Sequence, residues 1–166
     1  MNKNNIYNKY CTCMQNHGLG AYAIACFTNG YYSINNEQPN FFHIFLILPM
    51  ILNERIRFLI RGKNNLGGVE QIETLISNKI YNKKDEIGAF YNLIDSYKNY
   101  TMTCIIFGLR TGLFQLINSV NIEALNVFNK EECDNHIFLS AYKLGQLFAN
   151  DKDSLLKLMN ATGVNL

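Results

Sequence analysis

Cationic side chains are the residues of this 166-residue chain whose type and spacing best suit a binding function. Four of them crowd the segment 53–63, and three stand further along the chain. Arginine binds carboxylates and phosphates through a planar fork of N–H donors, so these positions predict contact with an acidic protein partner or with DNA phosphates. The set comprises Arg55, Arg57, Arg61, Lys63, Lys83, Lys84 and Arg110.

A second interpretation of the same segment stays open. On a helix Arg57 and Arg61 share a face, and Glu54 can pair with Arg57. Such a pattern is also typical of an ordinary solvated helix face that binds nothing.

The sequence contains one candidate metal site. Cys11, Cys13 and His17 bring two thiols and an imidazole together, and both ligand types suit zinc. A C-x-C pair without a second paired-ligand motif is a weak zinc signature, so we expect no metal and no cofactor. In apolar helical contexts cysteine usually behaves as a small hydrophobic residue. The remaining cysteines occur in such contexts: Cys26, Cys104 and Cys133.

Catalytic motifs are missing from the sequence. There is no glycine loop followed by Lys and Ser or Thr, no paired-histidine zinc helix and no nucleophile elbow. His43 and His136 lie among apolar residues without a nearby acid or nucleophile in the sequence, which predicts core or boundary positions. We therefore expect a protein that is not an enzyme and has no small-molecule substrate.

The composition limits the classes of partner. A formal net charge of +2 is too small for the whole molecule to bind a polyanion, so any contact with DNA would come from a local patch. With 48% hydrophobic and 17% charged residues, the chain is less charged than an average domain, where about a quarter of residues are charged. This balance predicts apolar surface that a protein partner covers.

The length predicts one domain over residues 1–166, with 1–15 as a polar, loosely ordered start. Five cysteines, an odd number, and no N-terminal signal pattern predict a reducing cytoplasm.

The hydrophobic periodicity predicts a mainly α fold. A helix capped by Asn16 is expected to end near Asn29 and Gly30. Residues 41–52 are apolar nearly all round but too few to span a membrane, so we expect a buried central helix that kinks or restarts near Leu48 because of Pro49. A polar helix over 53–63 should follow.

Further helices are predicted over 69–77, from about 85 to 108, over 137–148 and over 153–163. Between them, the turn-prone pair Asn118 and Ser119 predicts a small β-hairpin within 113–128. Helix, helix and hairpin is the order of a winged-helix unit, and a plain helical bundle is the alternative.

Four stretches together resemble a known family. They are "NHGLGAYAIACFTNGYY" (16–32), "FLILPMILNERIR" (45–57), "AYKLGQLFA" (141–149) and "ATGV" (161–164). In this order they are similar to the middle component of three-component ABC systems, which are bacterial conflict and defence operons that include Lamassu-type antiphage systems. The chain departs from the family pattern at Gln146, Leu147 and Asn165, where Arg, Trp and Pro are usual.

The resemblance implies an accessory subunit without catalytic activity. It would be encoded beside an SMC-like ABC ATPase and an effector such as a nuclease, and would bridge the two in an antiviral or anti-plasmid complex that engages DNA. The residues alone also allow a free-standing winged-helix DNA-binding protein.

Overall fold

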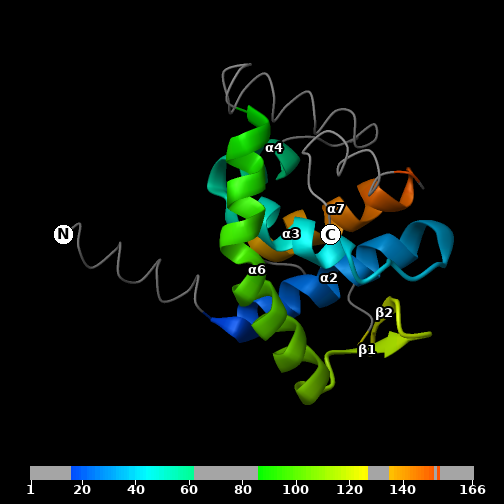
Figure 1. Ribbon diagram of the computed structural model, residues 1–166. Helices are drawn as coiled ribbons and strands as arrows, with labels where there is room; N and C mark the ends of the chain where they lie inside the picture. Colours follow the sequence, from blue (N-terminus) through cyan, green and yellow to red (C-terminus); the bar gives the residue numbers. More distant parts are fainter. Residues whose placement is uncertain (1–15, 62–85, 127–134, 152, 154–166) are drawn as a thin grey trace.

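A computed structural model describes residues 16–61, 86–126, 135–151 and 153 of the chain. This part is mainly helical with one small antiparallel sheet, as predicted (Figure 1). The elements in chain order are α2 (His17–Asn35), α3 (His43–Leu52), α4 (Glu54–Arg61), α6 (Glu86–Thr111), β1 (Phe114–Ile117), β2 (Asn121–Ala124) and α7 (His136–Ala149). The helices predicted over 69–77 and 153–163 lie outside the described residues.

Among the described helices, α2 and α7 pack most closely together. A Cβ atom added at Gly30 of α2 would collide with the carbonyl oxygen of Tyr142 in α7, and one added at Gly145 would collide with the carbonyl oxygen of Phe27. Glycine at both positions therefore lets the two backbones touch.

The prediction that α2 ends near Gly30 was wrong. Asn16 caps the helix as predicted, since its Oδ1 accepts from the N–H groups of Gly18 at 3.0 Å and Leu19 at 3.3 Å. The helix then continues to Asn35 and ends at Asn36, whose φ of 56° is left-handed. Gly30 is in the helix for close packing rather than as a stop, because the contact with α7 outweighs the weak helix propensity of glycine.

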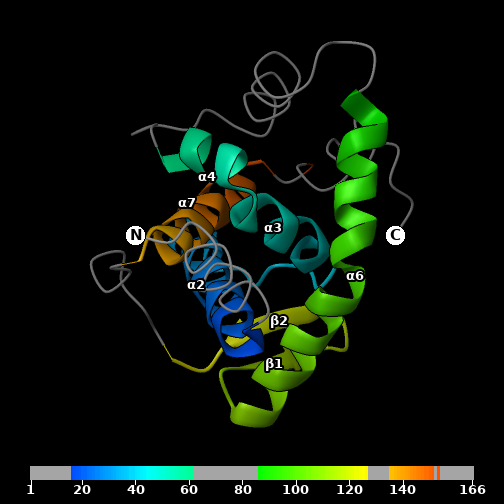
Figure 2. The ribbon, with the colours of Figure 1, turned by 90° about the vertical axis from the view of Figure 1, so that its left-hand side faces the viewer.

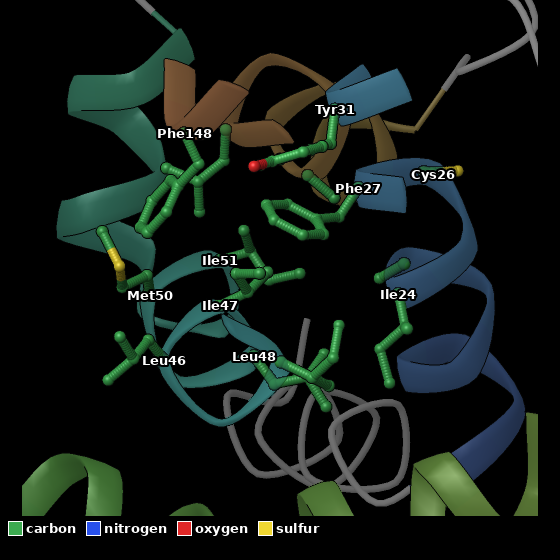
Figure 3. Close-up of a cluster of buried hydrophobic side chains, with 14 of the residues drawn as sticks. Ile24, Cys26, Phe27, Tyr31, Leu46, Ile47, Leu48, Met50, Ile51 and Phe148 are labelled. Atoms are coloured by element: carbon green, nitrogen blue, oxygen red, sulfur yellow. The ribbon is translucent and has the colours of Figure 1, made fainter. Parts of the chain in front are cut away.

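Helix α3 is the buried centre of the molecule. All ten of its residues are buried, as the apolar run predicted. In Figure 3 its side chains, among them Leu46, Ile47 and Ile51, share the interior with Phe27 of α2 and Phe148 of α7.

The predicted restart near Leu48 does not occur. Pro49 lies inside α3, and the helix continues through it to Leu52. The break falls at Asn53, which takes an extended conformation with ψ of 116°. An asparagine in that conformation caps the next helix, so the break is set by the cap of α4 and not by the proline.

Helix α6 lies along one side of the molecule, and its C-terminal end leads into the hairpin (Figures 1 and 2). Gly112 has a φ of 69° and follows the last helical residue, which is the usual glycine stop. The predicted hairpin is confirmed: β1 pairs antiparallel with β2, and the turn residues Asn118 and Ser119 both have positive φ, 51° and 62°. Positive φ at both central positions matches the twist of a tight hairpin.

The hairpin is joined to the segment that precedes α3. Phe41 N–H donates to Val120 O at 2.7 Å, and Ile122 N–H donates to Pro39 O at 3.0 Å. The order of helices and hairpin fits a winged-helix unit, which stays a prediction. None of the described helices is both long and apolar enough to cross a membrane.

Candidate partner-binding surface

Helix α4 carries three of the predicted contact residues and is strongly two-sided. Its start is capped by Asn53, whose Oδ1 accepts from Arg55 N–H at 3.0 Å and Ile56 N–H at 3.2 Å. Ile56 and Ile60 are buried, and the helix packs on α7. Phe58 points the other way and is 72% exposed, the highest value for a large apolar side chain among the described residues.

Arg57 has a structural role that the sequence did not reveal. Its Nη1 donates to Ile51 O at 2.8 Å and to Leu52 O at 3.5 Å. These are carbonyls of the last turn of α3, which have no partner within their own helix. The predicted pairing with Glu54 does not describe this geometry: the Arg57 guanidinium fastens the end of α3 to α4.

Arg55 and Arg61 are exposed and lie three residues before and three residues after Phe58. Side chains three apart are neighbours on a helix surface, so an aromatic ring lies between two cations on the outer face of α4. We call Arg55, Phe58 and Arg61 the α4 surface. Exposed arginine and aromatic side chains together are typical of protein interfaces.

Sequence reasoning missed two residues of this region. Phe58 was overlooked because it lies in a charged segment and belongs to no apolar repeat that the sequence showed. Lys143 of α7 was overlooked because it stands alone among the apolar residues of that helix; its Nζ donates to Arg61 O at 3.0 Å. A cation at a helix C-terminus is favoured by the helix dipole, so Lys143 also supports α4.

The remaining predicted cations do not extend the α4 surface within the described residues. Lys63, Lys83 and Lys84 lie outside those residues. Arg110 is exposed in the last turn of α6, which is beside the hairpin, whereas α4 lies toward the opposite end of the molecule (Figures 1 and 2). The structure thus separates Arg110 from the α4 arginines.

Of the two histidines predicted at core or boundary positions, only His43 is buried. His43 is buried in the core, its ring lies 5.4 Å from that of Phe148, and its Nδ1 is 3.0 Å from Asn40 O. Since a carbonyl only accepts, the Nδ1 carries a proton. Burial lowers the pKa of His43 to about 4, against a smaller opposing effect of the bond to Asn40. His136 is exposed at the first residue of α7.

The metal candidate is only partly within the described residues. His17 begins α2 and is exposed, while Cys11 and Cys13 lie outside. Cys26 and Cys104 are buried as predicted for small hydrophobic residues. In the described ranges, no three His, Cys, Asp or Glu side chains gather where they could hold a metal ion.

Comparison with known proteins identifies the class of the chain. No curated protein and no solved structure matches it. The model of one family, the ABC-three component (ABC-3C) system Middle Component 3, matches residues 4–165. Two stretches that carried the resemblance, 16–32 and 141–149, fall in the crossing helices α2 and α7. Since the match covers nearly the whole chain, the protein belongs to this family and is a component of an ABC three-component system, where it partners other components of that system.

Proposed function

We propose that the chain is an adaptor subunit without catalytic activity, which bridges an SMC-like ABC ATPase and an effector nuclease. The complex would act in the bacterial cytoplasm as an antiviral or anti-plasmid defence of the Lamassu type, with residues 1–166 folding as one domain. Family membership supports a place between other components. The observation that carries the proposal is the exposure of Phe58 between Arg55 and Arg61 on α4.

A protein partner explains the α4 surface better than DNA alone. A phosphate backbone would use the arginines but would gain nothing from an exposed phenyl ring, whereas an apolar pocket edged by carboxylates would use all three side chains. Removing an aromatic anchor from the centre of an interface typically costs about 2 kcal/mol or more of binding free energy. We therefore expect an acidic pocket as the complement of the α4 surface, and we propose that the ATPase provides it.

The surface is also held in place before binding. Asn53 caps the start of α4, Lys143 bonds to a carbonyl at its end, and Arg57 joins it to the buried helix α3. A surface that is already ordered loses little conformational entropy when a partner docks, which favours affinity.

Co-purification tests the proposal. The tagged chain is expressed with the products of its neighbouring genes, and the recovered complex is weighed by native mass spectrometry. We expect a stable complex with a large ATPase, and we expect Phe58→Ala or the double variant R55E/R61E to weaken binding of the ATPase at least tenfold. R55K/R61K keeps both charges and is the matched control.

Two results would overturn the proposal. One is recovery of the wild-type chain alone, retained on DNA at low salt, which would make it a free DNA-binding protein. The other is an ATPase complex that forms equally well with R55E/R61E and with Phe58→Ala, which would remove the α4 surface from the interface.

A further inference from the structure

The exposed face of α6 carries a second set of apolar side chains between two cations. Met102 and Ile106 are 42% and 44% exposed, although both are large and apolar. Lys98 lies four residues before Met102, and Arg110 lies four residues after Ile106; both are exposed. Side chains at i and i+4 are neighbours along a helix, so these four make one continuous row: cation, methionine, isoleucine, cation.

No other charged residue interrupts the row along α6 itself. Between Lys98 and Arg110 the sequence contains no acidic or basic residue, and the one nearby acid, Asp95, lies a turn beyond Lys98. Leu109, which is 36% exposed, lies three residues after Ile106 and widens the apolar part. At 1.5 Å per residue the two cations stand about 18 Å apart along the helix axis. We call Lys98, Met102, Ile106, Leu109 and Arg110 the α6 row.

The opposite side of α6 packs in the core, so the α6 row faces outward. Thr101, Cys104 and Ile105 are buried, at 2% exposure or less. Gly108 packs under the ring of Phe114, where a Cβ atom would collide with that ring. Rotation of α6 to hide the row would expose these residues instead, so the row is a stable feature of the surface.

We propose that the α6 row binds an acidic amphipathic helix of another component of the complex. That helix would place apolar side chains against Met102 and Ile106 and carboxylates near Lys98 and Arg110. This inference rests on the proposed adaptor function and adds a second docking surface, on the half of α6 that leads away from α4 to the hairpin (Figure 1). A bridging subunit requires two such separate surfaces.

The charges argue against a second copy of this chain as the occupant. If two α6 rows met antiparallel with Met102 on Ile106, Lys98 of one copy would face Arg110 of the other. If they met parallel, Lys98 would face Lys98 and Arg110 would face Arg110. Like charges oppose one another in both arrangements, whereas an acidic helix satisfies both ends.

Site-specific photo-crosslinking tests the proposal on the full co-purified complex. Benzoylphenylalanine is placed at position 106, the complex is irradiated, and crosslinked peptides are identified by mass spectrometry. We expect a crosslink to another component, in a segment whose apolar residues are flanked by Asp or Glu. A crosslink to a second copy of the chain, or to a segment without flanking acids, would overturn the proposal.

Charge reversal supplies the second measurement. We expect K98E/R110E to weaken binding of the crosslinked component about tenfold or more while the ATPase stays bound, and K98R/R110K to bind as wild type does. R55E/R61E makes the same change in net charge on α4 and should show the converse loss. If the wild-type chain recovers no other component, the adaptor function itself fails. If the complex forms and K98E/R110E binds every component normally, only the α6 inference fails.

Discussion

Gly145 of α7 faces Gly30 of α2 so closely that a Cβ atom on Gly145 would lie 3.1 Å from the carbonyl carbon of Gly30. Each glycine lies within one of the stretches by which the chain resembles its family, 16–32 and 141–149. Both stretches therefore include the residues through which two helices touch. The family resemblance in this region is a property of the core.

Alanine at either glycine tests this contact. Gly30→Ala and Gly145→Ala should each lower the free energy of unfolding by on the order of 3 kcal/mol, or prevent folding, because the added methyl would meet the backbone of the facing helix. Gly18→Ala in the same helix is the matched control, since the nearest atoms there are side-chain atoms at 3.1 Å or more. It should change stability by less than about 1 kcal/mol. Urea unfolding followed by circular dichroism provides the comparison, and equal stability of all three variants would refute the close crossing.

Two arginines of α4, Arg57 and Arg55, should contribute differently to the stability of the fold. Arg57→Ala should lower the free energy of unfolding by about 1 to 2 kcal/mol, because it removes a charged donor from the carbonyls of Ile51 and Leu52. Arg55→Ala should stay within about 0.5 kcal/mol of wild type, as exposed substitutions usually do. Thermal unfolding of the isolated chain measures both. A loss of the same size at Arg55 would mean that Arg57 has no special structural role.

Protonation of His43 should make the fold acid-sensitive. The pKa of His43 is lowered from 6.5 to about 4 in the folded chain, so below pH 6.5 the unfolded chain binds a proton that the folded chain does not. The free energy of unfolding should therefore fall as the pH drops from about 6.5 to 4, by about 3 kcal/mol in all for this group. Above pH 6.5 the contribution is constant.

His43→Asn isolates that effect from the titration of the acids. Asparagine can still donate to Asn40 O but binds no proton, and the packing lost from the ring is the same at every pH. The difference between the unfolding free energies of wild type and variant should thus change with pH only between about 6.5 and 4. Parallel curves across that range would show that His43 takes up its proton equally in both states.

The hairpin turn offers a stabilising substitution. Asn118 and Ser119 both have positive φ, and Asn-Gly is the pair best suited to such a turn. Ser119→Gly should raise the free energy of unfolding by about 0.5 kcal/mol, because it removes a Cβ that is unfavourable at a φ of 62°. Ser119→Ala keeps a Cβ and is the matched control, which should stay within about 0.5 kcal/mol of wild type. Differential scanning calorimetry of the three proteins should show Ser119→Gly as the most stable, and a loss of stability in Ser119→Gly would contradict the assigned turn.

Local rules predicted most of the described elements correctly. Apolar repeats located α2, α3, α6 and α7, the cap at Asn16 was confirmed, and the pair Asn118 and Ser119 located the hairpin. These features depend on residues close in sequence, so they can be read without the fold.

Errors arose where a residue acts through a contact outside its own helix. Gly30 resembles a helix stop until Tyr142, far along the chain, is known to lie against it. Arg57 resembles a surface charge until the last carbonyls of α3 are known to face it. The exposure of Phe58 likewise depends on which side of α4 packs on α7. A helix of eight residues contains too few turns for the apolar periodicity to show that side.

Helix α3 is fastened at both of its ends. At its start, Phe41 N–H is bonded to the hairpin at Val120, and at its end the carbonyl of Ile51 is bonded to Arg57 of α4. Ten residues of α-helix measure about 15 Å. The helix thus acts as a spacer of fixed length, so two proteins docked at the α4 end and at the hairpin end would be held at a set separation.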